Sequence, residues 1–142
     1  EPLESMVIGQ QVPVLGVCVG MQMLASGSDE GVLPGLNWVP GRVRAFASTP
    51  EAAQLPMPHM GWNDLQVKPG AKLFSGFEPQ PHFYFLHSYY FACDDKAHSV
   101  ATVTYGQKFD CVVSKGHIHG VQCHPEKSHH FGAQLLKNFA EL

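Results

Sequence analysis

Apolar and polar residues change their spacing along the chain, and each spacing predicts a different element. Val12–Val17 is a continuous apolar run, typical of a buried parallel strand. Val19–Ala25 follows with Met and Leu at helical spacing, before turn-forming residues at 26–31. Glu1–Gln11 is consistent with the end of a helix. The chain is therefore predicted to begin with a helix end, a strand, a sharp turn and a second helix.

The middle of the chain changes from loops to strands. Residues 32–58 are rich in Gly and Pro, which predicts loops around one strand at Arg42–Phe46. Short segments rich in Val, Phe, Tyr and Thr then predict further strands. These segments are Asp64–Val67, His82–Tyr90, Ser99–Tyr105, Cys111–Ser114 and Ile118–Cys123. The second half of the chain is therefore predicted to be mostly β structure.

The chain ends in a predicted amphipathic helix. Phe131, Leu135, Leu136 and Phe139 fall at helical spacing, and Ser128 is the predicted N-cap. We find neither an internal repeat nor a low-complexity segment. Helices at both ends and strands between them predict an α/β fold.

Composition favours one compact domain over residues 1–142, with 44% hydrophobic and only 15% charged residues. The net charge of -3 argues against nucleic acid and anionic membranes as partners. No apolar run approaches the roughly 20 residues of a membrane span, and no signal peptide is evident. The four cysteines form no C-x-x-C pair and indicate reduced thiols in a cytoplasmic protein.

Gly16-Val17-Cys18-Val19-Gly20 has the G-x-C-x-G form of a nucleophile elbow, between the predicted strand and helix. Small residues two before and two after the nucleophile let neighbouring backbone pass. The positive end of the helix dipole is expected to lower the pKa of the Cys18 thiol. The alternative is a buried structural cysteine beside a glycine-rich turn.

A nucleophilic cysteine needs a base, and His124-Pro125-Glu126 offers a histidine with a nearby carboxylate. If the strand that begins at Ile118 continues through this point, His124 and Glu126 lie on one face, and Glu126 can orient the imidazole. The alternative is a surface histidine and a solvated glutamate at a strand end. The two motifs together favour a Cys-His-Glu triad.

These motifs, with Gly120-Val121-Gln122-Cys123 before the histidine, resemble the class I (triad) glutamine amidotransferases. Pro58-His59-Met60-Gly61-Trp62-Asn63, Phe83 to Tyr90 and Glu126 to His129 are similar to the glutaminase subunits of imidazole glycerol phosphate synthases within that family. The resemblance covers Val14 to Leu142. It implies a flavodoxin-like α/β fold, with a mostly parallel sheet flanked by helices.

The resemblance also implies roles for individual residues. Cys18 attacks glutamine, His124 transfers the proton and Glu126 orients His124. The glutamine-binding positions are Gln22, Ser88 and Tyr89, and the backbone N–H of Val19 is one oxyanion donor. No cofactor or metal is implied.

A protein partner is implied as well. Trp62, Tyr84 and Lys127 match positions that face a (β/α)8-barrel synthase subunit. In the family that subunit receives the ammonia and makes imidazole glycerol phosphate for histidine biosynthesis. Large amphipathic rings are enriched at interface hot spots, although a core position is the alternative for Tyr84 and Tyr90.

The chain departs from the family pattern in two places. Cys123 stands where the family has Phe, which is expected to loosen packing without affecting the chemistry. Only 17 residues precede Cys18. The first strands of the fold and a glycine-rich loop that supplies a second oxyanion donor are therefore expected to be absent, as in an N-terminally truncated domain.

Three other functions are alternatives. His117, His119 and Cys123 could share a strand face as zinc ligands, but positions i, i+2 and i+6 of one strand lie too far apart for one ion. A truncated domain could dock on a partner without hydrolysing glutamine. A triad glutaminase could also serve another synthase, although the Pro58–Asn63 motif argues against it.

Overall fold

The computed structural model describes residues 2–52, 54–78 and 80–142. The chain begins with α1 (Pro2–Glu4) and a π-helical turn (Ser5–Gly9). Strand β1 (Val14–Val17) follows and leads directly into helix α2 (Val19–Gln22). The predicted order of helix, strand, sharp turn and helix is confirmed.

Helix α2 ends at Gln22, three residues before the predicted end at Ala25. The N–H groups of Leu24 and Ala25 bond to carbonyl groups three residues back, as in a tightened last turn. The carbonyl groups of the same two residues accept hydrogen bonds from Val39 and Asn37. Contacts with a later loop therefore end the helix.

The rest of the chain is mostly strands. They are β2 (Gly27–Ser28), β3 (Gly41–Ala45), β4 (His59–Asp64), β5 (Gln66–Val67), β6 (His82–His87), β7 (Tyr89–Cys93), β8 (Ser99–Tyr105), β9 (Gln107–Lys115) and β10 (Ile118–Val121). Single 3-10 turns lie at Phe46–Ser48, Lys72–Phe74, Lys96–His98 and Pro125–Lys127. The last element is α3 (His129–Ala140), close to the predicted helix.

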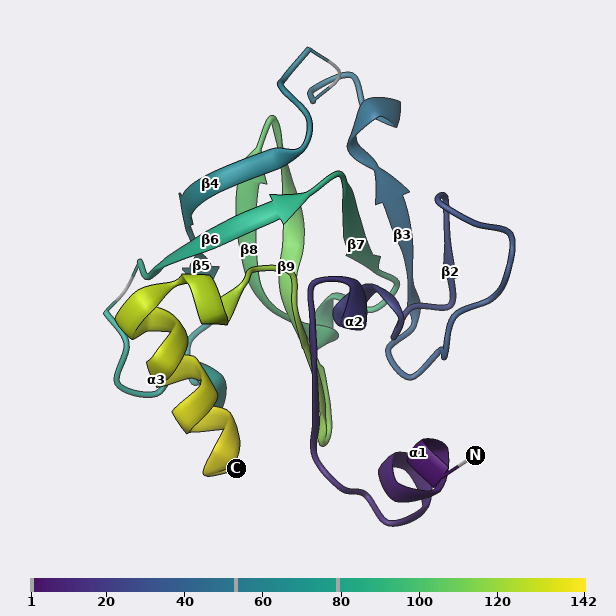
Figure 1. The fold of residues 1–142 in the computed structure, drawn as a ribbon, viewed down its shortest axis with the longest axis vertical. Coiled ribbons are helices and arrows are strands. Elements are labelled where there is room, and N and C mark those ends of the chain that lie inside the picture. The colour runs from purple at the N-terminus through teal and green to yellow at the C-terminus, as the bar shows by residue number, and fades with distance from the viewer. Residues whose placement is uncertain (1, 53, 79) are drawn as a thin grey trace.

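Two sheets organise the fold (Figure 1). The larger sheet has the strand order β1-β10-β9-β7-β3-β2, with β8 paired to both β9 and β5. The smaller sheet contains β4 and β6. Strand β1 lies at one end of the larger sheet and runs parallel to β10, with Val17 opposite Val121. The ends of β1 and β10 therefore lie side by side.

The mostly parallel sheet predicted above is wrong. Among the described residues, only the β1–β10 and β2–β3 pairs are parallel, and the other pairs are antiparallel. The chain passes from β8 to β9 at Gly106 and from β9 to β10 at Gly116–His117. Such short connections allow antiparallel pairing, whereas a parallel pair needs a long crossover. The fold is α/β with a mixed sheet and few helices.

Several strand predictions also differ from the structure, and the strand predicted at Cys111–Ser114 extends over Gln107–Lys115. The single strand predicted at His82–Tyr90 is divided at Ser88, because β6 pairs with β4 while β7 pairs with β3 and β9. The strand predicted at Asp64–Val67 is preceded by β4, whose sequence is poor in β-branched residues. Pairing with the aromatic-rich β6 compensates for that weak local preference.

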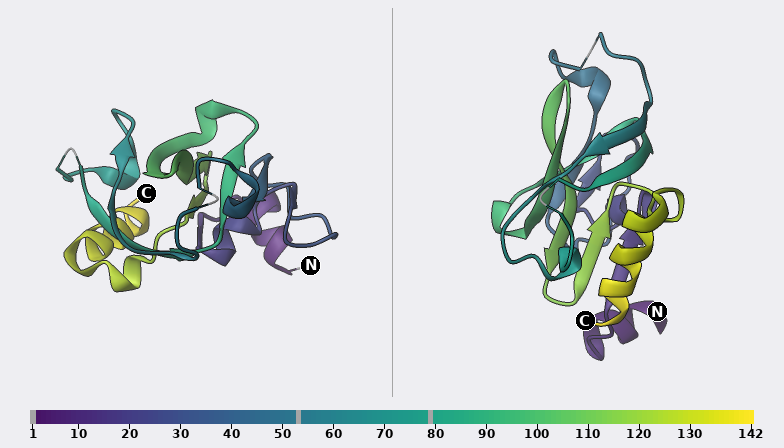
Figure 2. Two further views of the ribbon diagram at one scale, coloured as in Figure 1. Left: turned by 90° about the horizontal axis from the view of Figure 1, so that it is seen from above. Right: turned by 90° about the vertical axis from the view of Figure 1, so that its left-hand side faces the viewer.

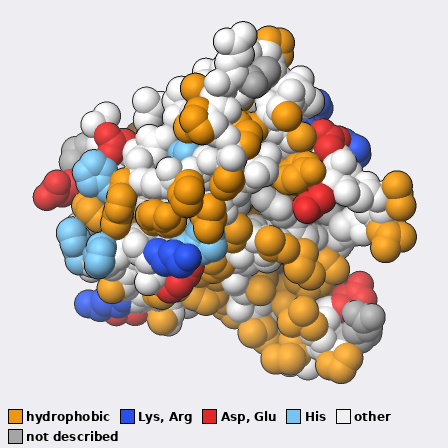
Figure 3. Space-filling model, turned by 45° about the horizontal axis from the view of Figure 1, so that its top comes forward, with side chains coloured by type: hydrophobic (Ala, Val, Ile, Leu, Met, Phe, Trp, Pro, Cys, Tyr) orange, Lys and Arg blue, Asp and Glu red, His pale blue; other side chains and the backbone are white. Residues whose placement is uncertain are grey.

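The main core lies where β6, the larger sheet and α3 meet. Its fully buried aromatic rings include Phe46, Phe83 and Phe85, and α3 contributes Leu135. Figure 2 shows α3 along one side of the molecule, with both termini at the same end. Apolar side chains also gather over the N-terminal helical segment (Figure 3), where Leu3 and Ile8 are exposed.

Candidate active site

Cys18 lies at a strained turn between β1 and α2, as the G-x-C-x-G motif predicts. Its backbone has φ 54° and ψ -108°, which L-residues rarely adopt. A Cβ on Gly16 would lie 2.5 Å from the carbonyl oxygen of Gly20, so the turn requires glycine at position 16. The Cys18 N–H donates to the carbonyl of Val121 (2.8 Å), which joins the elbow to the end of β10.

Burial raises the pKa of the Cys18 thiol, contrary to the expected lowering. The backbone N–H of Val19 opposes that rise, the charge of Glu126 adds to it, and a hydrogen bond from Gln122 opposes it. Helix α2 has only four residues, so its dipole is too small to dominate. The thiol is therefore protonated near neutral pH and depends on a base for activation.

His124 and Glu126 form the predicted pair. Nδ1 of His124 lies 2.6 Å from Oε1 of Glu126. A carboxylate can only accept, so Nδ1 carries the proton and Nε2 has a free lone pair. Nε2 is buried and has no hydrogen-bond partner among the described residues. The ring is thus oriented by Glu126 and available as a base.

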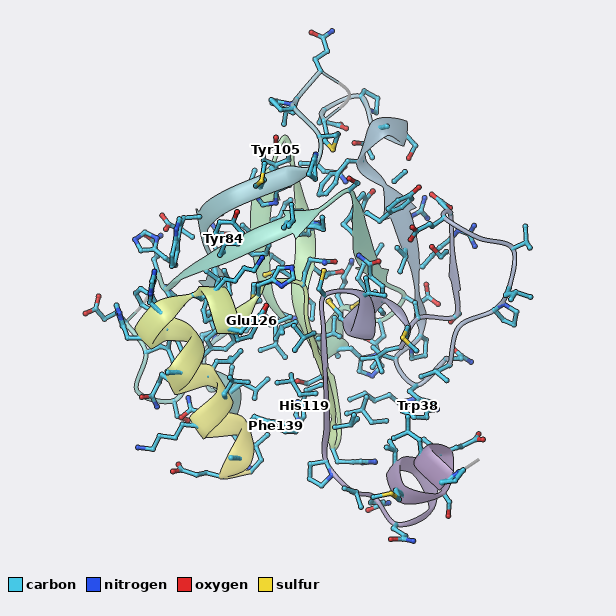
Figure 4. All side chains as sticks on the ribbon, in the orientation of Figure 1. Trp38, Tyr84, Tyr105, His119, Glu126 and Phe139 are labelled. Atoms are coloured by element: carbon cyan, nitrogen blue, oxygen red, sulfur yellow. The ribbon has the colours of Figure 1, made fainter. Side chains whose placement is uncertain are left out.

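The contact arises from a turn and not from a continuing strand. Strand β10 ends at Val121, and Pro125 begins a 3-10 turn that brings Glu126 back to His124. Ser128 precedes α3 but makes no capping hydrogen bond. Its hydroxyl instead donates to the His124 carbonyl (2.6 Å) and accepts from the Tyr84 N–H (2.9 Å). Figure 4 shows Tyr84 and Glu126 near the beginning of α3.

Of the predicted glutamine-binding residues, Gln22 and Tyr89 are in contact. Nε2 of Gln22 lies 3.3 Å from the carbonyl oxygen of Tyr89. Ser88 is exposed at the break between β6 and β7. The side chain of Val19 points to solvent, while its backbone N–H faces the thiol.

Gln122 is a site residue that the motifs alone did not single out. It is fully buried, and its Nε2 lies 3.5 Å from the Cys18 sulfur. Its Oε1 accepts a hydrogen bond from Gln22 (3.0 Å). The available signal was an amide two residues before His124, between the apolar Val121 and Cys123. Gln122 links the nucleophile to the expected substrate-binding residue.

The three predicted interface residues gather on one outer surface, the aromatic face, made of Trp62, Tyr84, Lys127 and His129. Trp62 and Tyr84 are cross-strand partners with ring centroids 6.2 Å apart. Lys127 lies over the Tyr84 ring (5.9 Å), and His129 stacks on Trp62 (5.6 Å). Trp62 is 48% exposed, whereas Tyr90 is a core residue.

The described residues contain no group of three potential ligands placed to hold a metal ion. Of the residues weighed as zinc ligands, His119 bonds through Nδ1 to Ser114 (2.7 Å), and Cys123 is buried in the core. The four cysteines are free thiols. No helix in the described part of the chain combines the length and apolar character that a membrane crossing requires.

Sequence comparisons match the chain to one family over nearly its whole length. The family described as class-I glutamine amidotransferase matches residues 2–142. The chain belongs to the class-I glutamine amidotransferase family.

Curated relatives give a closer comparison. The chain is 56% identical over 142 residues to the imidazole glycerol phosphate synthase subunit HisH of Bdellovibrio bacteriovorus, covering all of this chain and 70% of that protein. It is 46% identical over 140 residues to the HisH subunit of Leptospira interrogans, covering 99% of this chain and 69% of that protein. The chain therefore spans about seven tenths of these relatives.

Solved structures support the fold. A glutamine amidotransferase from Thermotoga maritima superposes with a TM-score of 0.62 at 21% identity, covering 99% of this chain and 50% of that one. A second glutamine amidotransferase gives a TM-score of 0.66 at 17% identity, covering 97% of this chain and 66% of that one. At these identities the likeness concerns the fold alone.

Proposed function

We propose that this chain, as a single amidotransferase domain, hydrolyses glutamine through a cysteine thioester. Cys18 gives its thiol proton to Nε2 of His124, and the sulfur attacks the carbonyl carbon of the glutamine side-chain amide. His124 then returns the proton to the leaving nitrogen, and ammonia departs. Water attacks the thioester, which releases glutamate and regenerates the thiol.

One observation carries the proposal. The buried Nε2 of His124 has no partner among the described residues, while its Nδ1 is held by Glu126 at 2.6 Å. His124 follows the end of β10, and Cys18 follows the adjacent end of β1. The Cys18 sulfur lies 3.8 Å from the carbonyl oxygen of Leu86, so the thiol turns from that acceptor toward Nε2 of His124 when it gives up its proton. A base fixed in one tautomer near a strained nucleophile is the arrangement that acyl transfer requires.

The neighbouring groups fit the binding of glutamine. Gln22 bonds to the Tyr89 carbonyl one helical turn after Cys18, and Ser88 is the exposed residue that precedes Tyr89. The Val19 N–H belongs to the first helical residue after Cys18, where backbone donors lack partners within the helix. It can therefore donate to the oxyanion that forms during attack.

The second part of the proposal is that ammonia passes to a (β/α)8-barrel synthase subunit, which makes imidazole glycerol phosphate in histidine biosynthesis. Support comes from the relatives, which carry the name imidazole glycerol phosphate synthase subunit. The aromatic face adds a half-exposed tryptophan beside a tyrosine and a lysine, as at interface hot spots.

The test measures glutamate and ammonia released from glutamine, with the barrel subunit and its nucleotide ligand present. The 142-residue chain is compared with a version extended at its N-terminus and with Cys18→Ala in both. We expect Cys18→Ala to abolish hydrolysis and leave partner binding intact. Hydrolysis that persists in Cys18→Ala would exclude the triad.

The same assay separates the other functions. Activity of only the extended version would mean that a preceding segment completes the site. Silence of both versions, with binding retained, would favour a domain that only docks. Hydrolysis without binding to this barrel subunit would favour a glutaminase that serves another synthase.

A further inference from the structure

A buried pair of histidines lies beside the candidate site and has no role in the chemistry above. His59 on β4 and His87 on β6 are cross-strand partners that are 3% and 6% exposed. Nδ1 of His59 lies 2.9 Å from Nε2 of His87. Aromatic rings surround the pair, including Phe85 stacked on His59 at 5.0 Å. Burying two polar rings in such a site costs free energy unless their ring nitrogens are hydrogen-bonded.

The hydrogen bonds define the tautomer of both rings. Nδ1 of His87 lies 2.7 Å from the carbonyl oxygen of Tyr89, which can only accept, so this nitrogen carries the proton. Nε2 of His87 therefore accepts, and Nδ1 of His59 donates to it. Nε2 of His59 is left to accept from the Asn63 amide (3.4 Å). The three hydrogen bonds therefore run in one direction, from the Asn63 amide through the two rings to the Tyr89 carbonyl.

The arrangement requires two neutral rings, and burial provides them. Burial lowers the pKa of His59 to about 4 and that of His87 to about 3. Both rings are therefore uncharged near neutral pH. Protonation of either ring would put an N–H on its Nε2, which would then face another donor, and the hydrogen bond at that nitrogen would be lost.

The carbonyl oxygen of Tyr89 has a second donor. Nε2 of Gln22 lies 3.3 Å from it and also donates to Oε1 of Gln122 (3.0 Å). Gln122 in turn contacts the Cys18 sulfur at 3.5 Å. The Tyr89 oxygen and Oε1 of Gln122 therefore together orient the Gln22 amide, next to the nucleophile.

We propose that His87, supported by His59, is a positioning residue for glutamine, because its N–H holds the Tyr89 carbonyl where that oxygen orients the Gln22 amide. The inference rests on the proposed function, in which Gln22 and Tyr89 bind glutamine. A ring that served only to fill space would need no N–H at this position.

A matched pair of substitutions tests the hydrogen bond separately from packing. Asn and Leu are similar in size, but only His87→Asn keeps an N–H near the position of Nδ1. Each is made in the Cys18→Ala protein complexed with the barrel subunit, and the Kd of glutamine is measured by calorimetry. We expect His87→Leu to weaken binding about tenfold, as for one lost oriented hydrogen bond, and His87→Asn to stay within about threefold.

Equal Kd values for the Asn and Leu variants would overturn the positioning role. Phe85→Leu is the packing control, since that ring touches His59 without a polar contact, and we expect its Kd to be unchanged. A loss in Phe85→Leu equal to that of His87→Leu would also overturn the role. If the His87 variants do not fold, His59→Asn and His59→Leu are compared in the same way, because only Asn keeps the donor to His87.

The outcome is independent of the chemistry. Glutamine binding is read in a protein that lacks the Cys18 thiol, so turnover does not contribute. If the unsubstituted complex releases no glutamate but the glutamine Kd still differs between His87→Asn and His87→Leu, only the proposed hydrolysis is overturned. Absence of any glutamine binding would overturn both.

Discussion

The Nε2 of Gln122 lies 3.5 Å from the sulfur of Cys18. The amide donates toward a thiol whose pKa is raised by burial, and it therefore favours the thiolate over the thiol. Gln122 is itself fully buried, so this donor has a fixed place. The ionisation of Cys18 thus depends on Gln122, the residue that follows β10, as well as on the turn in which Cys18 lies.

Replacement of Gln122 changes the ionisation of Cys18. In Gln122→Met the donor is lost, so we expect the pKa of the thiol to rise further, because the thiolate loses a stabilising contact. The rate of alkylation by iodoacetamide, measured from pH 6 to 11, should reach its midpoint at a higher pH. Gln122→Glu should move it further in the same direction through its negative charge. An unchanged or lower midpoint would contradict the contact.

His124 and Glu126 are expected to differ in their contributions to turnover. His124→Ala removes the base, whereas Glu126→Ala leaves the base in place and removes only its orientation. We expect Glu126→Ala to lose less in kcat than His124→Ala, because orientation is a smaller task than proton transfer. Steady-state glutaminase kinetics of the two variants in complex with the barrel subunit decide this, with the exposed Lys137→Ala on α3 as the control. Equal losses would contradict the division of roles.

The histidine pair makes stability depend on pH. Folding lowers the pKa of His59 to about 4 and that of His87 to about 3, from an ordinary value of 6.5. Below pH 6.5 the unfolded chain therefore binds more protons than the folded one. The contribution of the neutral pair to the free energy of unfolding is therefore complete above pH 6.5. It is lost as the pH falls toward 4, by up to about 1.4 kcal/mol per pH unit for each ring.

Urea unfolding at pH 7, 6 and 5 measures this loss. The double variant His59→Asn, His87→Asn should be less stable at pH 7 but should lose less between pH 7 and 5. An equal loss in the two proteins would show that other groups cause the acid sensitivity.

Ser128 is expected to stabilise the site through its hydroxyl and not as a helix cap. Ser128→Ala leaves the Tyr84 N–H without its partner and removes one of two donors to the His124 carbonyl, which keeps the Lys127 N–H at 3.0 Å. The free energy of unfolding should fall by about 1–3 kcal/mol, the cost of a buried unsatisfied group. Ser48→Ala removes an exposed hydroxyl contact and should cost less than about 0.5 kcal/mol. Similar losses in denaturant titrations of both variants would count against this role.

The aromatic face predicts which surface residues matter for the partner. Trp62→Ala should weaken binding of the barrel subunit by about 2 kcal/mol, as for a hot-spot tryptophan. Met60 is more exposed and lies on the same outer side of β4, so Met60→Ala is the matched control. Calorimetric titration compares the two. Equal affinities would show that the partner binds elsewhere.

Local sequence predicts the elbow at Cys18 and the contact between His124 and Glu126, although a turn and not the predicted strand makes that contact. Gly16 and Cys18 encode the elbow within five residues, and His124 and Glu126 encode their contact within three. Strand β8 was predicted with its bounds, Ser99–Tyr105. Such features depend on neighbours in the chain, so local sequence is sufficient to predict them.

The remaining features depend on contacts between distant parts of the chain. The break at Ser88 and the antiparallel pairing depend on which strands meet, and that choice is made by burial across the whole chain. The raised pKa of Cys18 comes from desolvation, which no motif records. Gln122 and His87 acquire their roles from partners that are distant in sequence. Local sequence does not predict these features, because pairing, burial and hydrogen bonding between distant residues are properties of the folded chain.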